Sequence, residues 1–201
     1  MARVQEILWD GSWSAGAARL RWVMLKKPWF AWIFSNSPAA SPQELQARAD
    51  ESGPEAQNNL GAMLSNRNLQ AAAAISYLKA AEGGNSMAQN NLALMYATGE
   101  GVGRDEAQAT KWFARSAAQG DAAAQFHLGD RCFRASLKLP KLEADEALIE
   151  AFKWLQLAST SGYPNADRCR ERINLQMSRE AVVEGNRRIS SFVATPEVAA
   201  N

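Results

Sequence analysis

The chain has 201 residues, a formal net charge of +1 and an apolar content of 47%. This length and composition suffice for one packed domain or one short repeat array. The near-neutral charge argues against a dedicated nucleic-acid-binding protein, for which a strong basic excess is expected. The two cysteines, Cys132 and Cys169, are too few for a disulfide scaffold or a zinc module.

Residues 1–40 are rich in tryptophan, with five of the seven tryptophans of the chain. If translation starts at Met24, the segment resembles a minimal signal peptide, with two lysines, a short apolar run over 28–34 and then small residues. If it starts at the first residue, the apolar run lies too far into the chain for a signal peptide. Trp and Lys together also suit a membrane or protein interface. Three interpretations therefore stay open: a signal peptide, an interfacial or partner-binding segment, and a poorly ordered extension.

A helix start follows at Ser41, which can act as an N-cap, with Pro42 in the first turn and Glu44 completing a capping box. Gly53-Pro54 ends this helix, because proline disfavours helical geometry in the residue before it. We place the folded array over residues 41–192 and expect residues 193–201 to form a flexible tail.

A sequence motif is repeated along the chain: PEAQNNLG at 54–61 is followed by the similar segments SMAQNNLA at 86–93 and AAAQFHLG at 122–129. Periods of this size are typical of arrays of two-helix units, in which no unit buries its apolar face alone. The first helix of each unit carries alanine, leucine and a larger residue at i, i+4 and i+8.

The second helices repeat in the same way. Each has an amphipathic stripe of alanines around one aromatic residue, and Trp112 and Trp154 are expected to fill the space between units. Each ends at a glycine, which tolerates the left-handed conformation that closes a helix. A partial fourth unit is expected from Pro164 to about Met177. Ser178 can cap a last helix running to Phe192, which would cover the exposed end of the array.

The run from Lys111-Trp112-Phe113 to Gly120, together with the loop Gly99-Glu100-Gly101-Val102-Gly103, resembles the Sel-one-like repeat (SLR), a branch of the tetratricopeptide superfamily. The resemblance covers residues 54–177. It implies an all-α fold, a right-handed α-solenoid of two-helix repeats, here with a C-terminal capping helix. It also implies a concave face that binds partners and no shared catalytic residues. Bacterial relatives are often adaptors in signalling or at the cell envelope, and many are exported.

Candidate chemistry is sparse. The glycine loop follows a helix rather than a strand and lacks dinucleotide-loop spacing, so it predicts an interhelix connection. His127 is the only histidine, and it predicts a polar surface residue rather than a metal ligand. The carboxylates of residues 143–150 favour a solvated helix start. The cysteines are expected to be buried free thiols, with a disulfide as the alternative after export. We therefore expect no enzyme activity, cofactor or metal.

Asparagine pairs at equivalent places in successive units favour a binding surface instead. They lie off the apolar stripe of the first helices, and side-chain amides can hold a peptide backbone. Ordinary polar surface or packing between repeats is the alternative. The candidate concave-face residues are Asn58, Asn59, Asn90, Asn91, Leu94, Phe126, His127 and Asp130.

The sequence thus predicts a protein–protein interaction scaffold that binds a protein or peptide segment on the concave face. The alternative is an exported envelope protein that binds cell-wall material. We expect no nucleic-acid partner, and membrane contact only through residues 1–40, because no stretch reaches the about 18 apolar residues that a membrane span needs. We favour the cytoplasm, with export as the alternative, and the sequence leaves the oligomeric state open.

Overall fold

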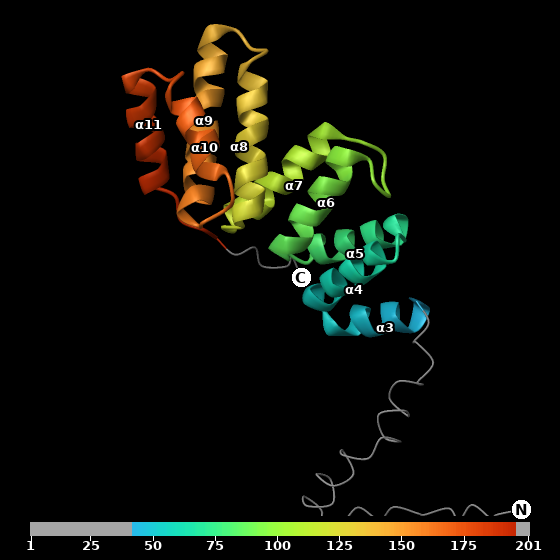
Figure 1. The fold of residues 1–201 in the computed structure, drawn as a ribbon. Coiled ribbons are helices and arrows are strands. Elements are labelled where there is room, and N and C mark those ends of the chain that lie inside the picture. The colour runs from blue at the N-terminus through green and yellow to red at the C-terminus, as the bar shows by residue number, and fades with distance from the viewer. Residues whose placement is uncertain (1–41, 196–201) are drawn as a thin grey trace, which may run out of the picture. The chain divides into compact units, whose positions relative to one another are not determined.

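The structure is a computed structural model and describes residues 42–195. Predictions for residues 1–40 and for the last six residues lie outside this range. Within it the regular elements are all helices (Figure 1): α3 (Pro42–Ser52), α4 (Pro54–Asn66), α5 (Gln70–Glu82), α6 (Ser86–Thr98), α7 (Glu106–Ala118), α8 (Ala122–Ser136), α9 (Lys141–Thr160), α10 (Ala166–Asn174) and α11 (Arg179–Ser190).

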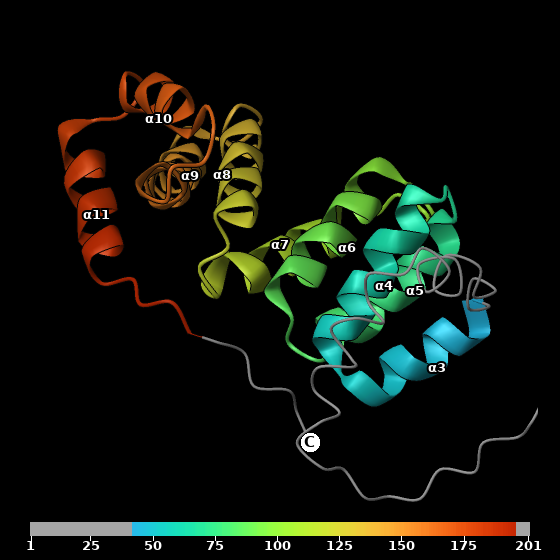
Figure 2. The same ribbon diagram turned by 60° about the horizontal axis from the view of Figure 1, so that its bottom comes forward.

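From α4 to α10 each helix packs against the next, within a compact unit that begins at Leu45. The pairs α4–α5, α6–α7 and α8–α9 form three repeat units, and α5 and α7 each also contact the first helix of the next unit. At the C-terminal end α9 packs against both α10 and α11, as the two ribbon views show (Figures 1 and 2). The prediction of an all-α solenoid with a C-terminal capping helix is confirmed. The expected limits at 41 and 192 stay predictions.

Small residues allow the helices of each unit to approach closely. An added Cβ at Gly61 would lie 2.7 Å from the ring of Tyr77, and one at Gly129 would lie 2.7 Å from Leu155. Ala88 and Ala124 on the first helices and Ala109 and Ala151 on the second helices are fully buried, whereas Ala56 of the first unit is half-buried. Trp112 and Trp154 are buried as expected, and both belong to the core that extends from α3 to α9. Apolar burial between units therefore stabilises the array.

The ends of the helices follow the local sequence. The side chains of Asn85, Asp105 and Asp121 accept hydrogen bonds from backbone N–H groups at the starts of α6, α7 and α8. Ser178 caps α11 as predicted, accepting from the Ala181 N–H at 3.2 Å. The glycines that follow the second helices all have positive φ, namely Gly84 (87°), Gly120 (95°) and Gly162 (75°).

The third unit differs from the other two in helix length. Helices α4 to α7 have 13 residues each, whereas α8 has 15 and α9 has 20, so the additional residues of the third unit mostly lengthen its helices. Helix α10 is shorter than expected, because Asn165 adopts a left-handed φ of 63° and the helix begins only at Ala166. Helix α11 ends at Ser190 rather than at Phe192.

The residues after α11 return to the array. The ring of Phe192 meets Trp154 edge-on at a centroid distance of 5.6 Å, and the Thr195 N–H donates to the Ala118 carbonyl at 3.1 Å. The start of the predicted tail, residues 193–195, is thus held against the end of α7. This contact joins the C-terminal cap to the second repeat unit.

Candidate functional site

The predicted asparagine pairs divide into buried and accessible members. Asn58 and Asn90 are only 6% and 9% exposed, so the expectation that they lie off the buried stripe is wrong. The Asn91 amide donates to Asn58 Oδ1 at 3.4 Å, which links α6 to α4. The contact of α6 with Asn58 agrees with the alternative of packing between repeats. Asn59 is exposed and Asn91 half-buried, so these two can still reach a partner.

A groove of about 630 Å³ opens beside α6, α7 and α8. We call it the α6–α8 groove. It contains three of the predicted site residues: Leu94, His127 and Asp130. Its full lining is Leu94, Ala97, Arg104, Glu106, Phe113, His127, Asp130, Arg131, Arg134, Ala135 and Lys138.

Two aromatic side chains, Phe113 and His127, line the groove, whereas the predicted site residue Phe126 does not. The Phe113 side chain is 1% exposed, and its ring lies 5.1 Å from that of His127. The Phe126 ring lies 5.7 Å from the His127 ring and 4.9 Å from the Tyr163 ring. Burial lowers the pKa of His127 below its usual 6.5, so the imidazole is neutral at pH 7. His127 is thus half-buried rather than fully exposed, with aromatic neighbours against its ring.

The rim of the groove is charged, with four basic side chains against two carboxylates. The Glu106 carboxylate accepts hydrogen bonds from Arg104, at 2.6 Å, and from Arg131. These bonds, with that of Arg104 the larger contribution, hold the pKa of Glu106 below its ordinary value. Arg134 pairs with Asp130 at 2.8 Å. With His127 neutral, the lining therefore carries an excess of two positive charges.

The family of the chain can be stated from its repeats. The Sel1 repeat model matches residues 54–85, 86–121 and 122–163, which together make up more than half of the chain. The chain belongs to the Sel1 repeat family. Proteins of this family are in general protein-interaction scaffolds, and the fold is typically non-catalytic. The resemblance seen in the sequence is confirmed.

Two solved structures are similar to this Sel1 repeat protein. The crystal structure of c5321, a protective antigen of uropathogenic Escherichia coli with an SLR fold, is 24% identical, with a TM-score of 0.65, over 78% of this chain and 33% of c5321. A Sel1 repeat protein from Oxalobacter formigenes is 29% identical, with a TM-score of 0.51, over 65% of this chain and 96% of that protein. The chain spans about a third of c5321, and that likeness shows the fold alone. No curated protein matches the chain.

The basic residues of the groove were not among the predicted site residues of this Sel1 repeat protein. In the repeat register, Arg131 stands where the earlier units have Met63 and Met95, and Arg134 stands where they have Asn66 and Thr98. A comparison of equivalent positions across units would have found this change. The pairing of Arg131 with Glu106, 25 positions earlier in the chain, has no local sequence signal.

The remaining candidate residues of this Sel1 repeat protein contribute to packing and to ion pairs within the fold. Glu146 and Glu150 accept from Arg188 of α11, at 2.6 and 2.7 Å, so they hold the capping helix rather than forming a merely solvated face. Cys132 and Cys169 are half-buried free thiols. Burial raises the pKa of Cys132 to about 11, so its thiol is protonated at neutral pH.

Between residues 42 and 195, no cluster of three or more His, Cys, Asp or Glu side chains is placed to hold a metal ion. None of the helices described there has the length and apolar character that a membrane crossing requires.

Proposed function

We propose that this Sel1 repeat protein is a scaffold that binds a segment of a partner protein in the α6–α8 groove. The observation that carries the proposal is the groove itself, which combines an aromatic wall with a charged rim. Aromatic and arginine side chains dominate the binding energy of many protein interfaces. The volume of about 630 Å³ suits a few side chains of a bound segment.

The apolar wall gives such a segment a place to anchor. Leu94 and Ala97 on α6 face the groove together with Ala135 on α8. Burial of an apolar side chain against them would contribute about 1.5–3 kcal/mol to binding. The accessible asparagines extend this surface, because Asn91 lies one helical turn before Leu94 on α6. An amide there can bond to the backbone of the segment as it leaves the groove.

Site-specific cross-linking in the native host tests this function. A photo-reactive amino acid would replace Ala135, which is exposed and lines the groove, and in a second variant Lys111, which is exposed on α7 and does not line it. We expect a discrete cross-linked partner, identified by mass spectrometry, at position 135 and not at 111. The same partners at both positions, or none at 135, would contradict a scaffold that uses this groove.

The envelope alternative depends on residues 1–40, which lie outside the described residues, and it stays a prediction. Export predicts cleavage before the folded array. N-terminal sequencing of the mature protein tests it: a start near Ser41 supports export, and an intact first residue counts against it.

A further inference from the structure

The carboxylates of the α6–α8 groove are already engaged by arginines of this chain. Glu106 is bound by Arg104 and Arg131, and Asp130 by Arg134. Lys138 makes no ion pair with any residue in the described range, and the Arg134 side chain is 75% exposed. The groove therefore offers a bound segment positive charge that its own acidic groups do not fully neutralise.

Arg131 makes the most hydrogen bonds of the groove cations. Its guanidinium donates to Thr110 Oγ1 at 3.0 Å and to the Glu106 carbonyl at 2.9 Å, and it lies 5.9 Å from the centre of the Phe113 ring. A guanidinium held in this way loses little further side-chain entropy when it binds a carboxylate. Glu106 shows that a carboxylate fits between Arg104 and Arg131 at this rim.

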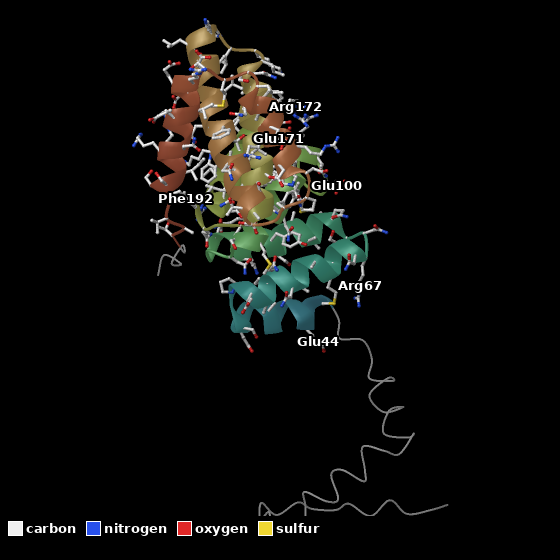
Figure 3. All side chains as sticks on the ribbon, turned by 60° about the vertical axis from the view of Figure 1, so that its left-hand side comes forward. Glu44, Arg67, Glu100, Glu171, Arg172 and Phe192 are labelled. Atoms are coloured by element: carbon white, nitrogen blue, oxygen red, sulfur yellow. The ribbon has the colours of Figure 1, made fainter. Side chains whose placement is uncertain are left out.

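Positive charge continues onto the next first helix. Helices α4 and α6 contain no lysine or arginine, whereas α8 and α10 together contain five arginines. Arg168 and Arg172 line a second hollow of about 290 Å³ on α10. The Arg172 guanidinium lies 4.7 Å from the centre of the Phe133 ring of α8. Figure 3 labels Arg172 among the side chains of the array. The basic positions therefore run from α8 to α10 and are absent from the earlier first helices.

We propose that the partner segment of this scaffold is acidic. Its aspartate or glutamate side chains pair with Arg134 and Lys138 and, further along, with Arg168 and Arg172. An apolar side chain beside them packs against Leu94, Ala97 and the half-buried ring of His127. The inference rests on the proposed function and adds the chemistry of the partner. A protein segment fits better than a nucleic acid, because Glu106 and Asp130 stand in the groove and the whole chain carries a net charge of only +1.

Selection of peptides from a random twelve-residue phage library on the full chain tests the proposal. We expect enrichment of aspartate and glutamate next to aromatic or aliphatic residues. A synthetic peptide of the selected consensus should bind about tenfold or more weakly to the double variant R134E/K138E than to the wild type, measured by fluorescence anisotropy. The variant K111E carries one charge reversal outside the groove and should bind like the wild type. Equal thermal midpoints would show that all three proteins are folded.

The other outcomes distinguish the two proposals. The selected peptides could lack an acidic excess and still lose binding to R134E/K138E. That result would overturn the acidic partner but support the scaffold function. If no peptide is enriched, or if the selected peptides bind all variants equally, both the scaffold function of this groove and its acidic partner are overturned. Equal weakening by K111E would show non-specific charge attraction and overturn the acidic site. A single-stranded DNA probe could also bind more strongly than any selected peptide and lose this binding in R134E/K138E. That result would overturn the acidic protein segment and indicate a nucleic-acid partner.

Discussion

At the scale of single residues, the tightest backbone approach in the array involves Gly101. This glycine lies in the loop between α6 and α7, and it meets the backbone at the start of α5 in the preceding unit. Its φ is 74°, and an added Cβ would lie 2.4 Å from the Gln70 carbonyl oxygen. The glycine loop therefore packs against the preceding unit, and this close approach explains why residue 101 is a glycine.

Gly101→Ala should lower the free energy of unfolding by about 1–3 kcal/mol, because the side chain is strained at this φ and neither backbone can easily move. Gly103→Ala is the matched control, since an added Cβ there meets nothing within 4 Å. We expect it to change stability by less than about 0.5 kcal/mol. Urea unfolding followed by circular dichroism measures both, and equal effects would contradict the close approach.

At the scale of elements, a buried glutamine links each first helix to the helix before it. Gln89 donates to the Ala81 carbonyl at 3.1 Å and accepts from Gln119 at 2.8 Å. Gln125 donates to the Ala117 carbonyl at 3.2 Å, but its Oε1 has no hydrogen-bond partner in the described part of the chain. The same side chain is thus fully bonded in one unit and partly bonded in the next.

Gln89→Met should therefore destabilise the protein by about 1 kcal/mol more than Gln125→Met, since it also breaks the part-buried hydrogen bond from Gln119. The two variants have the same change of side chain in equivalent positions, so each is the control of the other. Thermal and urea unfolding of both proteins measure the difference. A larger loss for Gln125→Met would contradict the bonding assigned here.

The capping helix is held by an ion cluster in which Arg188 binds Glu184, Glu146 and Glu150. Hydrogen bonds from Arg187 and then Arg188 lower the pKa of Glu184 from 4.5 to about 2. A carboxyl whose pKa is lower in the folded state stabilises that state above its unfolded pKa. This contribution is lost as the pH falls from about 4.5 towards 2.

Arg188→Gln should accordingly lower the unfolding midpoint at pH 7, and the gap from the wild type should narrow at pH 3. Arg179→Gln removes an exposed arginine from the same helix, for which no ion pair is found within residues 42–195, and it should have little effect at either pH. Thermal scans at the two pH values measure the gap. A gap that is independent of pH would show that Arg188 acts through packing alone.

At the scale of the whole molecule, stability depends on contacts between neighbouring helices. The strongly packed helix pairs of the described residues are consecutive or lie close in the chain, as in other repeat arrays. Helices α6 and α7 have repeat units on both sides, whereas α10 and α11 have neighbours mainly in α9. Local opening should therefore differ along the chain.

Hydrogen exchange followed by mass spectrometry should show the slowest exchange in α6 and α7 and faster exchange in α10 and α11. The reason is that a terminal helix can open without breaking contacts on a second side. Equal protection of all helices from 54 to 190 would contradict this order and indicate a single cooperative unit.

Much of this architecture follows from local patterns. Alanine and leucine at helical spacing, Ser178 as a cap and glycines after the second helices act within one or two turns, so their effect is visible in the sequence. The burial of Trp112 and Trp154 follows from the same stripe. The helix lengths of the third unit were less predictable, because residues 137–141 can extend a helix or form a loop.

The candidate site depends on the packing of one unit on the next. Asn58 and Asn59 look alike in the sequence, yet only Asn58 is covered by the following first helix. Arg131 and Glu106 meet from different helices and build the rim of the groove. The repeat, its helices and the family can be read from the sequence alone, because helical periodicity is a local property. Which side chains are buried, paired or open to a partner depends on the rotation of each unit against its neighbour, and this rotation is visible only in the three-dimensional structure.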